Sequence, residues 1–165
     1  MARSHLVVAE LKKCGVTHVV WLPDSESRFM YDALNAEPSL GFVPVCREGE
    51  AFAIATGLHV GGKQPVVLIQ NTGLFESGDA IRGTVFQMEV PLLLMVGYRG
   101  YHDMLEGKKP VDSAAVYTEP VLKAWGIPYY LLDTDEDIGK IAQAYDEAKK
   151  TGKTVAILIE REYDE

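Results

Sequence analysis

The runs Val66-Val67-Leu68-Ile69 and Leu92-Leu93-Leu94-Met95-Val96 decide the fold class of this chain. Neither run alternates apolar with polar residues, as a strand with one solvent-exposed face would. Continuous apolar runs of this length are typical of strands that are covered on both faces, as in parallel sheets. Both runs therefore predict central strands of a sheet that lies between two layers of helices.

Further strands and helices are predicted to either side of these two runs. The expected strands are residues 16–22, 42–46, 66–70, 92–96, 128–132 and 155–159. Helical periodicity is found in residues 6–14, 29–34, 51–58, 77–88, 115–125 and 135–149. The alternation of helix and strand predicts an α/β fold, an open and mainly parallel six-stranded sheet with helices on both faces.

Length and composition limit what the chain can be. Its 165 residues suffice for one domain with a core, so we expect a single domain over residues 1–165. With 16 Lys plus Arg against 24 Asp plus Glu, the net charge is −8, and nucleic acid is not an expected partner. No apolar run reaches membrane-spanning length and no signal peptide is evident, so we expect no membrane association and a cytoplasmic location. Cys14 and Cys46 are expected to be buried, reduced thiols.

Several familiar chemistries lack their motifs. The sequence has no phosphate-binding Gly-x-x-x-x-Gly-Lys-Ser/Thr loop, no Gly-x-Gly-x-x-Gly after the first expected strand, and no Gly-x-Ser-x-Gly. The four histidines lie at no metal-ligand spacing, so we expect no metal ligands in this chain.

Ligands of open parallel sheets bind at the loops that leave the carboxyl ends of the strands. Four expected loops lie there, namely residues 23–27, 47–50, 71–74 and 97–100. The polar segment 97–112 is too long for a simple connection, and we expect it to be a functional or interface loop.

One pattern of residues goes beyond the fold class. It comprises Arg47-Glu48-Gly49-Glu50-Ala51, Gly61-Gly62-Lys63-Gln64-Pro65 and Gln70-Asn71-Thr72-Gly73-Leu74. In order and spacing, these parts resemble the pyrimidine-binding domain of thiamine diphosphate enzymes over the first hundred residues. Within that family the resemblance is greatest to the α subunits of sulfopyruvate decarboxylases and to the related half of phosphonopyruvate decarboxylases, with Ala-Trp-Gly-Ile-Pro-Tyr at 124–129 as a further match.

The resemblance implies a catalytic and cofactor-binding role for Glu48. Thiamine chemistry needs a carboxylate beside N1′ of the aminopyrimidine, where it works as a general acid and base so that the 4′-nitrogen can take the proton from C2. Glu48 is the candidate by position, with Glu50 as the alternative. Without the surrounding pattern, a glutamate at the start of a helix is also explained by the helix dipole alone.

The resemblance also implies the other site residues. Those expected to bind the cofactor beside Glu48 are Pro23, Asn71, Thr72 and Gly73, and those expected to bind substrate are Ser25, Asn71, Thr72 and Arg99. A sulfonate or phosphonate needs hydrogen-bond donors and positive charge, which these substrate-binding candidates offer. Asp24 and Glu26 do not suit an anion, which leaves a different 2-oxo acid open, and Arg99 could instead be a solvated or interface residue.

The chain departs from the family in lacking a diphosphate site. Related enzymes hold the diphosphate and Mg²⁺ on a second domain with Gly-Asp-Gly or Gly-Asp-Ser and a later Asn. Here the nearest triplet, Gly78-Asp79-Ala80, lies inside an expected helix and no Asn follows it. We therefore expect a separate diphosphate-binding β subunit to hold Mg²⁺, and the pair to decarboxylate a 2-oxo acid, with sulfopyruvate as the first candidate. The alternatives are a phosphonopyruvate decarboxylase, a related carboligase, and a non-catalytic binding module with the same fold.

Overall fold

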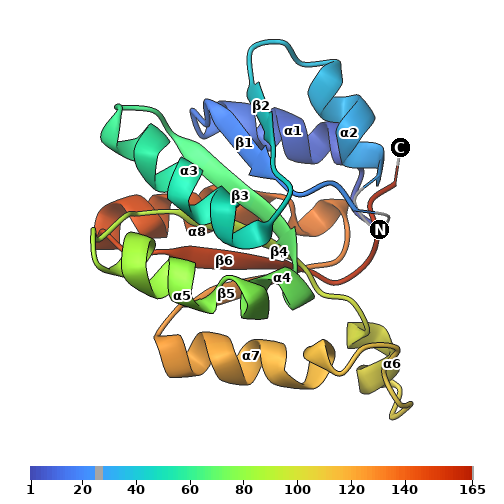
Figure 1. The fold of residues 1–165 in the computed structure, drawn as a ribbon. Helices are drawn as coiled ribbons and strands as arrows, with labels where there is room; N and C mark the ends of the chain where they lie inside the picture. The colour runs from blue at the N-terminus through green and yellow to red at the C-terminus, as the bar shows by residue number, and fades with distance from the viewer. Residues whose placement is uncertain (25–27, 165) are drawn as a thin grey trace.

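All six expected strands are present and form one parallel sheet (Figure 1). The computed structural model describes residues 1–24 and 28–164. The strands are β1 (His18–Trp21), β2 (Gly41–Pro44), β3 (Pro65–Gln70), β4 (Leu93–Gly97), β5 (Tyr129–Leu132) and β6 (Val155–Ile159). They lie side by side in the order β2-β1-β3-β4-β6-β5, and every pairing is parallel. The predicted fold class is confirmed, with a fully rather than mainly parallel sheet.

The two runs that predict the fold class lie at the centre of the sheet. β3 and β4 pair in register from Val66 with Leu93 to Gln70 with Gly97. Along β3, Val66 and Leu68 belong to one buried cluster, while Val67 and Ile69 belong to the other. Successive side chains of a strand point to opposite faces, so both faces of β3 are covered, as the absence of polar alternation predicts.

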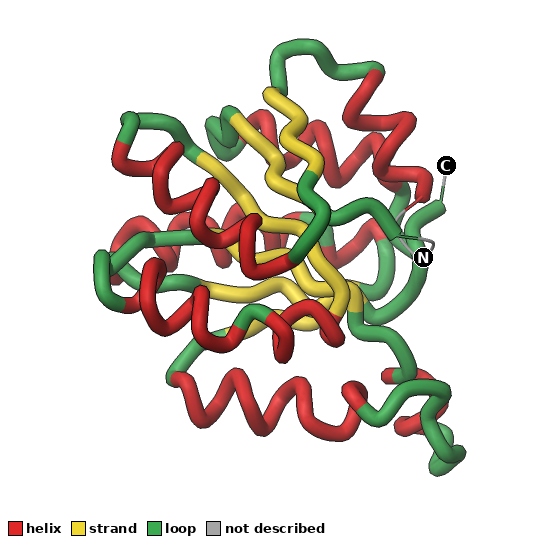
Figure 2. The backbone as a smooth tube through the Cα atoms, viewed as in Figure 1, coloured by secondary structure: helices red, strands yellow, loops and turns green. Residues whose placement is uncertain are grey.

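Helices form a layer on each face of the sheet (Figure 2). One layer contains α1 (Ser4–Lys13), α2 (Arg28–Asn35) and α8 (Gly139–Thr151), and α1 contacts both of the others. The other layer contains α3 (Glu48–Val60), α4 (Asn71–Glu76), α5 (Gly78–Ala80), the π-helical turn η1 (Ile81–Phe86) and α7 (Ala114–Trp125). The short helix α6 (Tyr101–Leu105) and the 3-10 turn η2 (Asp135–Asp137) lie at the carboxyl edge of the sheet.

Two segments expected as loops contain short helices. Residues 71–76 form α4, which is too short to show an apolar stripe in the sequence. Segment 97–112 contains α6, which begins after Gly100 with φ of 83°. A Cβ at Gly100 would lie 3.2 Å from Cβ of Pro110 and 3.3 Å from Cβ of Ala115, so both the positive φ and the close packing require glycine there.

The expectation of two buried thiols is wrong. Cys46 is exposed because it lies on the short connection between β2, the strand at one edge of the sheet, and the start of α3. Cys14 is only partly buried because it is the C-cap residue of α1. Both are free cysteines.

The two ends of the described chain lie together at the carboxyl edge of the sheet (Figure 1). Ser4 N–H donates to the Asp164 carbonyl oxygen at 3.0 Å, and Asp164 N–H donates to the Ala2 carbonyl oxygen at 3.0 Å. Tyr163, only 3% exposed, anchors this C-terminal segment in the core. Across residues 1–24 and 28–164, every helix is too short or too polar to cross a membrane.

Candidate active site at the carboxyl edge of the sheet

Glu48, the first residue of α3, lies against Gly73 in α4. A Cβ added to Gly73 would be 2.3 Å from Cγ of Glu48 and 2.7 Å from its Cδ, distances that no real Cβ tolerates. Gly73 is buried and Glu48 is partly buried. The Glu48 side chain therefore packs directly on Gly73. The contact lies at the edge of the sheet where ligands of such folds bind.

Glu50 has a different environment from Glu48. It is exposed, and its Oε2 accepts the Cys46 N–H at 3.4 Å, just before the first turn of its own helix. That contact is the local one expected of an acidic residue at a helix start. Of the two candidates for the acid–base carboxylate, Glu48 alone contacts the second helix of the site, so the geometry favours it.

Glu76, the last residue of α4, holds the start of α3. Its Oε1 pairs with Nε of Arg47, and its Oε2 accepts the Gly49 N–H at 2.9 Å. The Arg47 guanidinium beside it lowers the pKa of the Glu76 carboxyl from its usual value. The sequence gives no signal for this contact, because only the fold brings residues 47 and 76 together.

Asn71 does not lie on the surface where a ligand would contact it. It is fully buried, and its side-chain nitrogen donates to the Arg99 carbonyl oxygen at 3.1 Å and to the Thr118 hydroxyl at 3.3 Å. Its Oδ1 is buried without a hydrogen-bond partner in the described part of the chain. Asn71 thus joins α4 to the end of β4 and to α7, behind the surface that Glu48 occupies.

The other expected site residues are found around the same edge. Thr72 is exposed in the first turn of α4, and Pro23 is exposed after β1. Arg99 is exposed after β4 and lines a cavity of about 210 Å³. Ser25 lies outside the described residues, as does Glu26. The structure thus brings Glu48 and Gly73 into contact and places Thr72, Pro23 and Arg99 on loops or turns of the same edge.

The cavity that Arg99 lines is at the carboxyl ends of β3, β4 and β6. Its other described lining residues include Asp24, Gln70, Tyr98, Tyr101, His102, Arg161 and Tyr163. The rings of Tyr98 and Tyr101 stack with centroids 4.5 Å apart, and burial raises the pKa of both phenols. Glu48 is not among the lining residues, so the cavity and the Glu48–Gly73 contact are two separate features of this edge.

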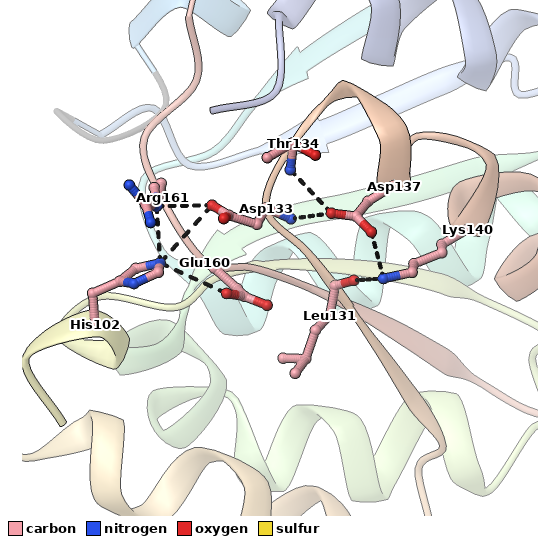
Figure 3. Close-up of polar contacts among 8 residues, drawn as sticks. All are labelled: His102, Leu131, Asp133, Thr134, Asp137, Lys140, Glu160 and Arg161. Carbon is pink, nitrogen blue, oxygen red and sulfur yellow. Dashed lines mark hydrogen bonds and ion pairs between the residues drawn. The ribbon is translucent and has the colours of Figure 1, made fainter. Parts of the chain in front are cut away.

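A cluster of charged side chains borders the cavity (Figure 3). His102 Nε2 lies 3.6 Å from Glu160 Oε2 and 3.9 Å from Asp133 Oδ1. Burial, and then the negative charge of Asp133, raise the pKa of the Glu160 carboxyl. These three side chains offer ligand atoms within 4.8 Å of one another, the spacing that a metal ion would need.

Arg161 supplies the positive charge of that cluster. Its Nε lies 2.9 Å from Asp133 Oδ1 and donates to His102 Nε2 at 3.0 Å. A positive guanidinium this close to two of the three ligand atoms disfavours a divalent cation beside them. The cluster links α6 to the ends of β5 and β6. The histidine spacing in the sequence gives no indication of this cluster, because residues 102, 133 and 160 are far apart in the chain.

Together these features suit the aminopyrimidine half of thiamine. The partly buried carboxylate of Glu48 packs against Gly73, in the space that any Cβ at position 73 would fill, at an accessible edge of the sheet. A general acid and base for a ring nitrogen needs such a carboxylate, held in place but not enclosed. Magnesium prefers an octahedral set of oxygen ligands, whereas the His102 cluster combines one imidazole and two carboxylates with the positive charge of Arg161.

The fold and the site define a parallel α/β domain with a partly buried carboxylate, that of Glu48, at the carboxyl edge of its sheet. Residues 1–119 match the family described as "Thiamine pyrophosphate enzyme, N-terminal TPP binding domain". The chain belongs to this family, which confirms the resemblance noted in the sequence.

Two relatives are similar over nearly all of the chain and a third over about half of it. The sulfopyruvate decarboxylase subunit alpha of Methanothermobacter thermautotrophicus is 30% identical over 165 residues, covering 97% of this chain and 96% of that protein. The subunit of the same name from Methanococcus maripaludis is 28% identical over 164 residues, covering 99% and 97%. The phosphonopyruvate decarboxylase of Streptomyces viridochromogenes is 29% identical over 94 residues, covering 57% of this chain and 24% of that protein.

Solved structures support the fold. The benzoylformate decarboxylase from Polynucleobacter necessarius superposes with a TM-score of 0.75 at 23% identity, covering 96% of this chain and 30% of that one. This chain therefore corresponds to about a third of that longer polypeptide.

Proposed function

We propose that this chain is the pyrimidine-binding subunit of a thiamine diphosphate-dependent 2-oxo acid decarboxylase. The observation that carries the proposal is the seating of Glu48 on Gly73 in a domain of the thiamine pyrophosphate family. The likeness to sulfopyruvate decarboxylase alpha subunits over nearly the full length of both chains supports a decarboxylase of this type.

Glu48 is the catalytic residue in this proposal. Bound thiamine diphosphate supplies a nucleophilic carbon and an electron sink for the decarboxylation. Glu48 exchanges a proton with N1′ of the aminopyrimidine, and its partial burial against Gly73 limits the positions its carboxyl can take. Thr72 and Pro23, exposed on the neighbouring turns, contact the cofactor, whereas buried Asn71 supports α4 from behind.

The substrate is a small anionic 2-oxo acid, with sulfopyruvate as the first candidate. Arg99, exposed at the end of β4, is our candidate for the contact to its anionic group, together with Ser25 and Thr72. Asp24 also lines the cavity beside Arg99, so the surroundings of Arg99 are not uniformly positive. Phosphonopyruvate is the second candidate, because the phosphonopyruvate decarboxylases match over a shorter region.

The enzyme is completed by a second subunit that binds diphosphate and holds Mg²⁺. Support comes from the relatives named as alpha subunits, which match this chain over nearly their whole length. A cytoplasmic location suits the exposed free thiol of Cys46, because reducing conditions keep such thiols intact.

The test is to combine the chain with a subunit that carries the Gly-Asp-Gly domain and to measure release of carbon dioxide from a series of 2-oxo acids. We expect the highest kcat/KM with sulfopyruvate and a lower value with phosphonopyruvate. Cofactor binding by the pair without carbon dioxide release from any 2-oxo acid would instead favour a carboligase or a non-catalytic module.

A further inference from the structure

Glu76 contacts the chain on both sides of Glu48. One carboxylate oxygen accepts the N–H of Gly49, which follows Glu48, at 2.9 Å. The other pairs with the guanidinium of Arg47, which precedes Glu48. Glu76 therefore binds both chain neighbours of the candidate catalytic residue, Gly49 through its backbone and Arg47 through its side chain.

Glu76 provides a hydrogen-bond acceptor for the first turn of α3. The first backbone N–H groups of a helix have no partners within the helix. The N-cap residue of α3, Arg47, makes no side-chain capping hydrogen bond within the described chain. A carboxylate from outside can satisfy such a donor with a charge-assisted hydrogen bond and also complements the helix dipole. Since Arg47 lowers the pKa of Glu76, the carboxylate is ionised at neutral pH.

Helix α4 thus holds Glu48 at two points. Gly73 packs against its side chain, and Glu76, about one turn later on the same helix, binds the Gly49 N–H and the Arg47 guanidinium on either side of it. Residues three apart on a helix lie on the same face, so both contacts come from one face of one short helix. A shift of α4 relative to α3 would change the position of the Glu48 carboxyl.

We propose that Glu76 is a positioning residue that fixes the carboxyl of Glu48 for proton exchange with the cofactor. Its effect on catalysis rests on the proposed function, whereas its effect on the structure does not. Misplacement of a catalytic group by about 1 Å can cost roughly 100-fold in rate, so a contact this close to Glu48 is expected to matter.

The variants are Glu76→Ala, which removes both contacts, and Glu76→Gln, which keeps an oxygen for the Gly49 N–H but loses the charge. Asp79→Ala is the matched control, because Asp79 is an acidic residue of the neighbouring helix α5 that is 89% exposed and pairs only locally with Arg82. Thermal unfolding of each variant shows whether it folds.

The first readouts use the cofactor-free chain. We expect Glu76→Ala to speed amide hydrogen exchange of Gly49 about tenfold, as the loss of one hydrogen bond predicts. We also expect it to change the ¹³C chemical shift of the Glu48 carboxyl at fixed pH, because that shift reports the surroundings of the group. Glu76→Gln should give smaller changes, and Asp79→Ala should give none. Unchanged exchange at Gly49 in Glu76→Ala would overturn the contact itself, and an unchanged ¹³C chemical shift of the Glu48 carboxyl would overturn the positioning role.

The second readouts use the complete two-subunit enzyme. We expect Glu76→Ala to lower kcat and exchange of the cofactor C2 proton by about 10- to 100-fold with little change in KM, and Glu76→Gln to recover part of the loss. In a Glu48→Gln background, Glu76→Ala should add almost nothing, because residues that act as a unit are not additive. A full additional loss in that background would show a general structural role and overturn the proposal. If the unmodified enzyme decarboxylates no 2-oxo acid, the proposed function fails, while the cofactor-free readouts still decide whether Glu76 positions Glu48.

Discussion

The Glu48 side chain packs so closely on Gly73 that there is no room for a Cβ at position 73. The Cβ of an alanine there would lie 2.3 Å from Cγ of Glu48, so either the Glu48 side chain or helix α4 would have to move. The identity of residue 73 is therefore tied to the conformation of residue 48, which belongs to another helix.

The first prediction follows from that contact. Gly73→Ala should lower kcat of the complete enzyme by roughly 100-fold, because it displaces the catalytic carboxyl. It should change the free energy of unfolding much less, because the atoms in the way belong to the flexible Glu48 side chain, which can turn aside. Steady-state kinetics and urea unfolding measure the two effects. The control is Gly139→Ala at the start of α8, where a Cβ meets nothing within 4 Å, and it should change kcat and stability little. Wild-type activity in Gly73→Ala would contradict the assignment of the site.

The second prediction separates the two glutamates of the α3 start. Glu48→Gln should leave the fold intact and slow exchange of the cofactor C2 proton by roughly 10²- to 10⁴-fold, because an amide cannot exchange the N1′ proton. Glu50→Gln should have a small effect, since Glu50 is exposed and contacts only the N–H of Cys46. Exchange monitored by NMR in deuterated buffer is the measurement. An equal or larger loss in Glu50→Gln would move the assignment to that residue.

The third prediction concerns Arg99 at the cavity edge. Arg99→Ala should raise KM for an anionic 2-oxo acid about tenfold, the value of one hydrogen bond to a charged group, with a smaller change in kcat. The reason is that a contact distant from the reacting bond is made equally in ground and transition states. Arg82→Ala removes an exposed arginine paired with Asp79 on another part of the surface and serves as the control. An unchanged KM in Arg99→Ala would remove Arg99 from the substrate site.

The fourth prediction concerns stability in acid. Lys140 and the backbone N–H groups of Thr134 and Asp133 lower the pKa of Asp137 to about 2 from 3.8 (Figure 3). A lowered pKa in the folded state means that the stabilisation is complete above the unfolded value and is lost as the pH falls toward 2. Asp137→Ala should therefore cost about 1 kcal/mol of unfolding free energy at pH 7, as loss of a capping residue does, and the difference from wild type should shrink between pH 4 and pH 2.

Urea unfolding at several pH values tests that dependence. Asp146→Ala, which replaces an exposed acidic residue of α8, is the matched control and should change stability little at any pH. A destabilisation by Asp137→Ala that stays constant down to pH 2 would contradict the ionic origin of the effect.

Much of the fold could be predicted because apolar pattern and burial coincide in a parallel sheet. The run of β6 matches its expected bounds, and the other five strands differ by one or two residues at their ends, where hydrogen bonds rather than hydrophobicity define the strand. Helix α4 was missed because six residues cannot show a periodic stripe. The exposure of Cys46 was missed because the sequence does not reveal that β2 is an edge strand.

The site could be predicted only in part. Glu48 and Gly73 were found through a family resemblance, and their contact required the fold to bring α3 and α4 together. Asn71 has the right position in the chain, but the structure turns its amide toward Arg99 and Thr118. The contacts of Glu76 join residues 27 and 29 positions apart, and no local pattern encodes them.

The fifth prediction is that this chain alone is catalytically silent and binds thiamine diphosphate weakly. It presents a carboxylate for the aminopyrimidine but lacks the Gly-Asp-Gly and Asn pair that would seat Mg²⁺ beside the diphosphate. If the cofactor spans two chains, its binding and the assembly of the chains are linked, so thiamine diphosphate with Mg²⁺ should tighten the complex by mass action. Sedimentation of the mixed subunits with and without cofactor measures this, and omission of Mg²⁺ alone should remove most of the effect. A homo-oligomer of this chain that bound the cofactor tightly and released carbon dioxide from a 2-oxo acid would contradict the two-subunit proposal.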